Sequence, residues 1–196
     1  MSEDPRQRRT RESLGAALAR LLETTPLDDI TVAELCREAG VHRTTFYAHA
    51  DDVHDFALAE FSRGIDRLTA VAVEPASESV AHVAGRYVES MRQVFEHVAE
   101  DRAGYRALFG SSTRGVFRGV LDERMRARAQ RALEVWADQG VVGAPVGSAA
   151  QAEAAAFIAG ALVGVIESWA LGDDGDAAAA AARVSTLMPG WWPRAE

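Results

Sequence analysis

The chain of 196 residues contains no lysine and only one cysteine. All 21 basic residues are therefore arginines, and this bias, with the abundant alanine and glycine, is typical of a GC-rich bacterial genome. The single cysteine, Cys36, cannot form a disulfide within the chain, so we expect a reducing, cytoplasmic setting. The polar N-terminus has no apolar stretch that would indicate a signal peptide.

Long hydrophobic runs and strand patterns are missing as well. The longest apolar run covers 154–166 and is bounded by Glu153 and Glu167. It is shorter than the roughly 18–20 residues that cross a bilayer, so we expect no membrane span. No segment alternates between apolar and polar residues for long enough to predict a strand. These absences, with the high alanine content, predict an all-α protein.

Patterns that would support catalysis or metal binding are also absent. The five histidines form no H-E-x-x-H motif, and the best metal-like pair is His97 with Asp101. The acidic segment 173–176 lacks the remainder of an EF-hand loop. No Ser-His-Asp or Cys-His arrangement and no glycine-rich phosphate loop is recognisable. We therefore predict that the protein is not an enzyme and uses no metal or other cofactor.

The formal net charge of −8 argues against a protein that is basic throughout, but the charge is unevenly distributed. Residues 1–50 contain 7 Arg and 8 acidic residues, a net of −1, whereas the remainder contains 14 Arg and 21 acidic residues, a net of −7. Within the first part, arginines cluster over 6–11. An anionic partner is therefore compatible with the N-terminal part and not with the rest.

Apolar residues at helical spacing recur along most of the chain. They predict helices over 6–24, 32–39, 43–49, 53–68, 80–98, 102–110, 116–136, 149–171 and 177–188. Pro75 interrupts the pattern between the fourth and fifth of these helices.

Two short helices joined by a tight glycine turn predict a helix-turn-helix motif. Thr31 and Glu34 have the spacing of a capping box at the start of the first helix. Gly40 can adopt the left-handed backbone that the turn requires. Cys36 is small enough to let the second helix cross closely, and Phe46 faces inward and anchors that helix.

The remaining side chains of the second helix face outward and are polar or aromatic. They can hydrogen-bond phosphates or base edges, and threonine methyl groups can contact thymine methyl groups. The set consists of Arg43, Thr44, Thr45, Tyr47 and His49.

The segment "ITVAELCREAGVHRTTFYAHADD", preceded by an arginine-rich first helix, resembles the DNA-binding part of TetR-type transcriptional regulators. The resemblance covers roughly residues 8 to 60, and the rest matches only in architecture, which in this family is a ligand-binding and dimerisation domain. It implies that helix 43–49 enters the major groove. Arg43 and Thr44 are then the base readers, with Thr45, Tyr47 and His49 on or near phosphates.

Three positions depart from the family's pattern. Ala50 stands where an aromatic residue is usual, Val53 where a phosphate-contacting lysine is usual, and His42 where a serine or threonine cap is common. The lysine is missing and the negatively charged Asp51 and Asp52 are adjacent, so we expect weaker binding of the DNA backbone. His42 either caps the helix less well or contacts phosphate itself.

Two further residues are predicted to contact DNA. Arg9 belongs to the cluster over 6–11, which either contacts a phosphate or is a solvated, frayed terminus. Thr31 lies at the start of the first motif helix. We divide the chain into a helix-turn-helix domain over 1–52, a connecting helix over 53–70 and a ligand-binding and dimerisation domain over 71–196.

The C-terminal part suggests a dimer interface and a ligand pocket. Gly160 and Gly164 form a small-x-x-x-small pair that favours a close helix crossing. We expect helices 149–171 and 177–188 to form a four-helix bundle with their copies, and the alternative is a crossing within one chain. Aromatic residues on the central helices are each explained as core, but as a set they suit a cavity for a flat or greasy molecule. The predicted pocket residues are Arg86, Tyr87, Phe95, Phe109, Phe117, Trp136, Glu167 and Trp169.

The sequence thus favours a DNA-binding, small-molecule-responsive repressor that binds a palindromic operator as a homodimer. The effector is a small molecule that the sequence does not name. The alternative is an all-helical sensor or enzyme that has lost DNA binding, which the acidic total, Asp51 and Asp52 support.

Overall fold

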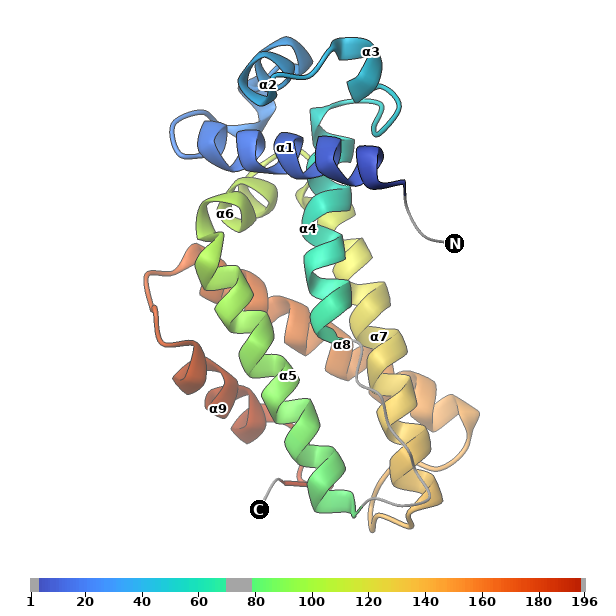
Figure 1. Cartoon of the computed structure of the whole chain (residues 1–196). Helices are drawn as coiled ribbons and strands as arrows, with labels where there is room; N and C mark the ends of the chain where they lie inside the picture. Colours follow the sequence, from blue (N-terminus) through green and yellow to red (C-terminus); the bar gives the residue numbers. More distant parts are fainter. Residues whose placement is uncertain (1–3, 70–78, 195–196) are drawn as a thin grey trace. The chain divides into compact units, whose positions relative to one another are not determined.

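The computed structural model describes residues 4–69 and 79–194, and within these ranges it contains helices and no strands (Figure 1). The all-α prediction is confirmed. The elements are α1 (Pro5–Leu22), a 3-10 turn η1 (Leu27–Asp29), α2 (Val32–Ala39), α3 (Arg43–Phe46), α4 (Val53–Thr69), α5 (Val80–Glu100), α6 (Arg102–Gly110), α7 (Arg114–Asp138), α8 (Ser148–Leu171) and α9 (Ala177–Leu187). Pro75 lies outside the described residues.

Helix α3 is shorter than the predicted segment 43–49. Its α-helical part ends at Phe46, and the chain then tightens into a turn. The amide of Ala48 donates to the carbonyl of Thr45 (3.2 Å), and the amide of His49 donates to that of Phe46 (2.8 Å). These i to i+3 bonds replace the α-helical ladder, as often happens in the last turn of a helix.

The contacts within the chain define two compact units. Unit 1 runs up to Arg63 and also contains Asp101–Phe117, and unit 2 contains the remaining described residues. The division made from sequence differs because it placed Asp101–Phe117 with the C-terminal part. The predicted boundary between 70 and 71 lies outside the described residues.

The core of unit 1 follows from the apolar face of α1. Leu14 and Leu18 are buried there, with Leu35 of α2, Phe46 of α3 and Phe56 of α4. The rings of Phe46 and Phe56 lie 6.0 Å apart between centroids. The short helices α2 and α3 are therefore held by tertiary packing, because helices of their length are marginal alone.

Asp28 connects three segments of unit 1. Its carboxylate lies 2.7 Å from Nε2 of His54 on α4. It also accepts hydrogen bonds from the amide (3.2 Å) and hydroxyl (2.9 Å) of Ser112, which lies between α6 and α7. The hydrogen bonds from His54 and Ser112 hold the pKa of the Asp28 carboxyl below its ordinary value. This junction explains why Asp101–Phe117 belongs to unit 1.

A close approach between α4 and α6 requires Gly104. A Cβ atom at this position would lie 2.0 Å from Cζ of Phe61 and 2.9 Å from a carboxylate oxygen of Asp101. We expect Gly104→Ala to lower the free energy of unfolding by about 1–3 kcal/mol, because the buried Phe61 ring must move. Chemical denaturation measures this.

Gly110, in the same helix, is the matched control. No described atom lies within 4 Å of the Cβ that Gly110→Ala would add. This variant should be neutral or slightly more stable, since alanine is the better helix former. Equal unfolding free energies for the two variants would contradict the close packing at Gly104.

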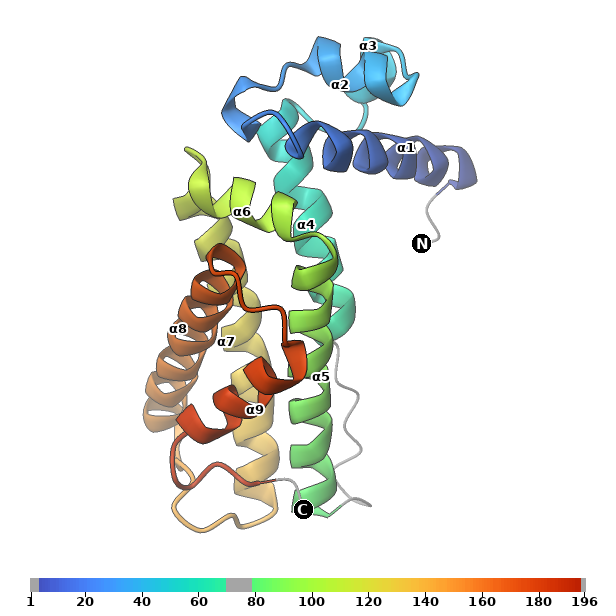
Figure 2. The ribbon, with the colours of Figure 1, turned by 90° about the vertical axis from the view of Figure 1, so that its left-hand side faces the viewer.

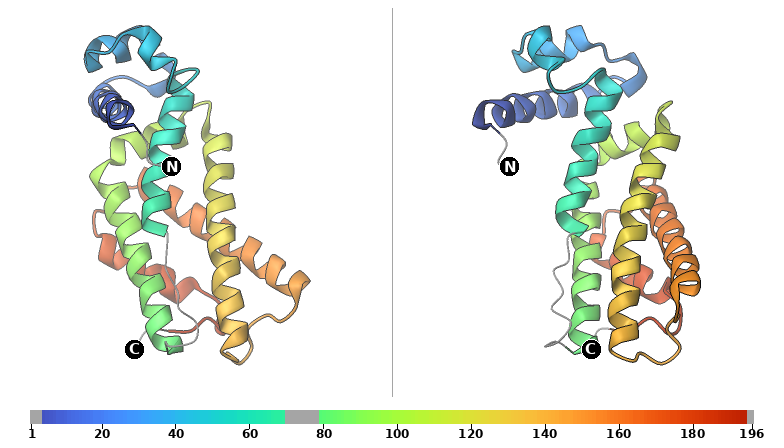
Figure 3. Two further views of the ribbon diagram at one scale, coloured as in Figure 1. Left: turned by 45° about the vertical axis from the view of Figure 1, so that its right-hand side comes forward. Right: turned by 90° about the vertical axis from the view of Figure 1, so that its right-hand side faces the viewer.

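Unit 2 is built from α5, α7, α8 and α9. Helix α9 packs against α5 and runs at an angle to it (Figure 2), and α8 runs obliquely to α7 (Figure 3). Phe95 of α5 packs edge-on against Trp169 of α8, with ring centroids 5.1 Å apart. After α9 the chain turns back, and Trp192 packs against Tyr87 and Trp136.

Helix α8 is long and apolar enough, by length and composition, to cross a membrane. Half of its most apolar window is buried inside the protein, and the core helix of a soluble protein passes the same test. Its buried side includes Ile158, Leu162, Val163 and Ile166. Burial within unit 2 thus accounts for the apolar residues on that side of α8.

Candidate functional site

The turn of the helix-turn-helix has the geometry that the sequence predicts. Gly40 ends α2 with φ 66° and ψ 30°, the left-handed conformation that glycine adopts without a Cβ penalty. The amide of Val41 donates to the carbonyl of Cys36 at 2.9 Å, which closes the end of the helix. Cys36 is buried, and burial raises the pKa of its thiol.

The start of α2 is a complete capping box. The amide of Glu34 donates to the Thr31 hydroxyl (3.2 Å), and the amide of Thr31 donates to the Glu34 carboxylate (3.0 Å). The Thr31 hydroxyl also donates to that carboxylate at 2.7 Å, and this hydrogen bond lowers the pKa of Glu34. The Thr31 side chain is therefore engaged in the cap, and its contact with DNA stays a prediction.

Phe46 is the anchor of α3. Its side chain is fully buried, and its ring packs edge-on against Tyr47 (5.6 Å) and at a tilt against Phe56 (6.0 Å). A helix of four residues offers no other fully buried side chain to hold it in place.

Four of the side chains that the sequence assigns to DNA contact are exposed on α3 and directly after it. Arg43, Thr44 and Thr45 are exposed, and Tyr47 is 57% exposed. The side chains of the first three make no hydrogen bond to any residue that the structure describes. The structure thus brings this group together on one accessible face with free donors and acceptors.

His42 and Arg9 lie at the beginning of two helices. His42 is exposed and occupies the N-cap position of α3, where its side chain makes no capping hydrogen bond. It is therefore a poorer cap than a serine or threonine, as the sequence suggests. Arg9 is exposed near the start of α1, with its Nε 3.4 Å from the carbonyl oxygen of Pro5.

His49 lies in a more basic environment than the sequence indicates. Partial burial, together with the charges of Arg11 and Arg63, lowers the pKa of its imidazole. Glu60 lies between these arginines, 2.5 Å from Arg63 and 3.7 Å from Arg11. Arg63 could not be assigned to this site from the motif, because it lies on α4, fourteen positions after His49.

The acidic residues after α3 have a structural role. A carboxylate oxygen of Asp52 accepts from the amide of Asp55 (2.8 Å), and Asp55 in turn accepts from the amide of Asp51 (3.2 Å). This arrangement caps the N-terminus of α4. Ala50 and Val53 are both buried, so these two positions serve the core and present no phosphate-binding group.

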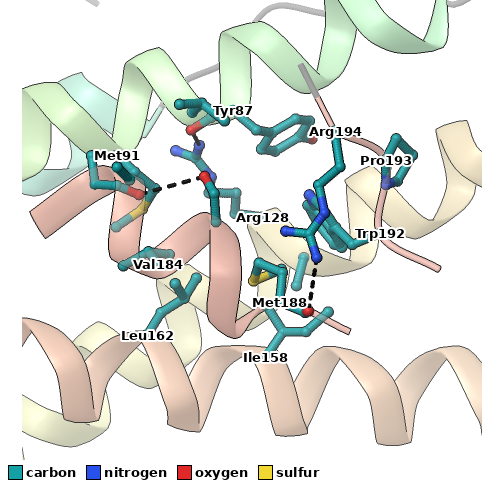
Figure 4. A pocket seen from close by; sticks show the side chains of 15 residues that line it. Tyr87, Met91, Arg128, Ile158, Leu162, Val184, Met188, Trp192, Pro193 and Arg194 are labelled. Atoms are coloured by element: carbon teal, nitrogen blue, oxygen red, sulfur yellow. Dashed lines mark hydrogen bonds between the residues drawn. The ribbon is translucent and has the colours of Figure 1, made fainter. Parts of the chain in front are cut away.

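Unit 2 contains a cavity of about 300 Å³ (Figure 4). Its wall is built by α5, α7, α8, α9 and the segment that follows α9. Most lining side chains are apolar, and the polar exceptions are two arginines, Tyr87 and Ser185. The lining includes Tyr87, Met91, Arg128, Leu162, Met188 and Trp192.

Of the eight predicted pocket residues, Tyr87 alone lines this cavity. Phe95 and Trp169 pack on each other instead, and Trp136 lies behind Tyr87 and Trp192.

The other four predicted pocket residues also lie elsewhere. Glu167 is buried and forms an ion pair with Arg118, and Arg86 is half-buried outside the cavity wall. Phe109 and Phe117 pack on each other in unit 1, with centroids 4.9 Å apart. The cavity residues that the sequence did not reveal come mainly from α9 and the segment after it.

The glycine pair on α8 makes no crossing within the described chain. No described atom lies within 4 Å of a Cβ built at Gly160 or Gly164. Gly160 and Ala161 are exposed, and Phe157, one turn earlier, is 66% exposed. These residues form an open apolar stripe on the side of α8 that faces away from the core of unit 2.

A helix-turn-helix with an open polar face, joined to an all-helical unit, defines the class of helix-turn-helix transcriptional regulators. Residues 87–190 match the family model TetR_C_8, described as a transcriptional regulator C-terminal region. Because the match covers more than half of the chain, the protein belongs to the TetR family of transcriptional regulators. No curated protein sequence matches the chain.

Solved structures have the same fold along nearly the whole chain. FadR from Bacillus subtilis, in complex with stearoyl-CoA, is similar with a TM-score of 0.68 at 15% identity, over 92% of this chain and 98% of that one. A TetR-family regulator from Pectobacterium atrosepticum has a TM-score of 0.61 at 21% identity, over 100% of both chains. RolR in complex with resorcinol has a TM-score of 0.55 at 21% identity, over 95% and 90%. At these identities the likeness concerns the fold.

Proposed function

We propose that the protein is a repressor that binds a palindromic operator as a homodimer and releases it when a small molecule occupies unit 2. The observation that carries the DNA-binding part is the accessible face of α3, with Arg43, Thr44 and Thr45 exposed above the buried Phe46. In a dimer, two such helices about 34–36 Å apart read successive major grooves on one side of the duplex.

The dimer is supported by the open stripe on α8. A soluble protein seldom leaves a phenylalanine and adjacent small residues exposed along one helix without a partner. Gly160 and Gly164 permit a close approach of a second α8. A two-fold axis through this stripe would pair identical surfaces, as in most homodimers.

The effector response is supported by the cavity of unit 2. FadR and RolR have the same fold, and their structures hold stearoyl-CoA and resorcinol. A molecule in the cavity releases DNA only if it binds more tightly to a state whose α3 helices do not match the groove spacing. The response is thus a difference in affinity between two states.

Selection of bound sequences from random DNA tests the DNA-binding proposal. We expect an enriched palindrome, and binding that weakens steeply as salt concentration rises. A protein that forms no complex even at low salt would support the alternative, a sensor or enzyme without DNA binding. Transcription in vitro from a promoter carrying the selected operator tests repression.

Arg43 is the side chain that we assign to base reading. We expect Arg43→Ala to weaken operator binding by about 1–3 kcal/mol and to relax sequence preference at one position of each half-site. Quantitative footprinting on the selected operator and its single-base variants measures both effects.

Arg20→Ala serves as the control for Arg43→Ala. Arg20 lies on α1 and pairs with Glu38 at 2.7 Å, so its replacement also removes one positive charge from unit 1. We expect the sequence preference to stay intact in this variant. An unchanged footprint and preference in Arg43→Ala would show that another side chain reads the bases.

A further inference from the structure

The cavity of unit 2 contains a buried positive charge. Arg128 of α7 is only 3% exposed, yet it belongs to the cavity wall. Its guanidinium donates to the hydroxyl of Ser90 (2.5 Å) and to the backbone carbonyl of Tyr87 (3.2 Å). It also lies over the Tyr87 ring, 4.8 Å from the centroid. All these partners are neutral.

No carboxylate balances this charge among the residues that the structure describes. Arg128 forms no ion pair there, and the positive charge of Arg131 adds to the destabilisation of its charged form. Burial lowers the pKa of Arg128 to about 10, so the guanidinium still carries its charge at neutral pH. A buried charge without a counter-ion is costly, and proteins ordinarily pair it.

The rest of the cavity wall adds a second positive charge and a large apolar surface. Arg194, in the segment after α9, supplies a second positive side chain, and no aspartate or glutamate lines the cavity (Figure 4). Apolar side chains, among them Met91, Ile158 and Leu162, cover most of the remaining wall. The cavity wall therefore combines two cationic side chains with a mostly apolar surface.

Arg128 retains the capacity to bind an anion. A guanidinium has five N–H groups in a planar fork, and two of them are used in hydrogen bonds to described residues. The fork matches a carboxylate, which accepts two parallel hydrogen bonds. Since Arg128 is buried, such charge-assisted bonds are stronger there than at the surface.

We propose that this cavity binds a small amphipathic carboxylate, with its carboxylate on Arg128 and Arg194 and its apolar body against α5 and α8. The volume of about 300 Å³ is at the lower end of ligand pockets, which suits a medium-chain fatty acid or an arylalkanoic acid. This inference rests on the proposed function, since it names the chemical class of the effector.

The experiment compares three probes with eight-carbon chains and different head groups: octanoate, octan-1-ol and octylammonium. Calorimetric titration of the full chain at neutral pH, without DNA, measures each affinity. We expect octanoate to bind about tenfold or more tightly than octanol, and the cation not to bind. Octanol binding as tightly as octanoate would overturn the assignment without any variant.

Arg128→Met tests the residue, because methionine keeps the apolar stem and removes the charge. We expect octanoate binding to weaken about tenfold or more and the preference over octanol to disappear. Arg131→Met, on the exposed side of the same helix, removes an equal charge and should bind octanoate like the parent protein. Retained octanoate preference in Arg128→Met would overturn the proposal.

Arg128→Lys covers the case in which the methionine variant does not fold. Lysine keeps the charge but not the planar fork, so octanoate should still bind better than octanol, with lower affinity than in the parent protein. Loss of all preference for octanoate in a folded Arg128→Lys, or unchanged affinity, would contradict a bidentate contact.

Operator release is measured separately, on the selected DNA. If octanoate binds through Arg128 and leaves operator affinity unchanged, the anion site stands and the proposed effector response fails. If a neutral molecule in the cavity releases the operator and octanoate does not bind, the effector response stands and the carboxylate assignment fails.

Discussion

Phe46→Ala is expected to lower the free energy of unfolding by about 3–5 kcal/mol and to abolish operator binding. The ring of Phe46 is fully buried and packs on Phe56 of α4. Its removal leaves a cavity beneath a helix of four residues that has no other fully buried side chain. Such a helix does not persist on its own, so the polar face loses its position even where the rest of the protein stays folded.

Chemical denaturation followed by circular dichroism measures the stability, and footprinting at low temperature measures binding of the folded fraction. Phe46→Leu separates the two effects, because leucine retains most of the apolar volume. We expect it to lose less stability than the alanine variant and to keep part of the operator affinity.

Tyr47→Ala is the control at the adjacent position. Tyr47 is 57% exposed, so its truncation should change stability by only about 0.5 kcal/mol. Operator binding should nevertheless weaken, because Tyr47 belongs to the predicted contact surface. If Phe46→Ala and Tyr47→Ala had equal stability, Phe46 would not be the anchor of α3.

The sequence predicts the helix-turn-helix well because its determinants are local. Thr31 and Glu34 form their capping box within one helical turn, and Gly40 ends the same helix by its own backbone conformation. The predicted end of α3 is wrong by three residues. The observed end depends on the carbonyls to which the amides of Ala48 and His49 donate, and these are three residues earlier rather than four. Periodicity does not distinguish an α-helical from a 3-10 hydrogen bond in a last turn.

The cavity could not be predicted in the same way. Periodicity shows that Phe95, Trp136 and Trp169 are buried, but not whether buried side chains meet one another or leave a space. Here they meet one another, and the space opens where α9 and the segment around Trp192 return to α5. That closure joins positions about a hundred residues apart in the sequence, for which a single sequence has no signal.

The position of Arg128 beside the cavity could not be predicted from the sequence either. Helix α7 carries several arginines, among them Arg124, Arg126, Arg128 and Arg131. Arg128 falls at i+3 from Met125 and i+7 from Leu121, on the apolar face. This spacing indicates burial, but it does not show that the side chain lies beside a cavity. Two of the other three form surface ion pairs with Asp66 and with an acidic residue of α7. The contacts of Arg128 with Ser90 and Tyr87 of α5 make it the one of the four that is a buried cation beside the cavity.

The prediction for Phe157 concerns the proposed dimer. We expect Phe157→Asp to convert the dimer to a monomer, because a charge then replaces the largest exposed apolar side chain of the stripe on α8. Operator affinity should fall by about 10²–10⁴-fold, since each half-site is then bound without the help of a linked second copy. Light scattering after size exclusion measures the mass, and footprinting measures the affinity.

Val142→Asp is the control for Phe157→Asp, because it adds the same charge at an exposed apolar residue outside the proposed interface. Val142 is 93% exposed and lies in the loop between α7 and α8, away from the stripe. Both residues are exposed in the single chain, so neither variant should change the helical content or shift stability by more than about 0.5 kcal/mol. A folded Phe157→Asp that remains dimeric would place the two-fold contact elsewhere. A folded monomer with unchanged operator affinity would show that one copy alone accounts for DNA binding.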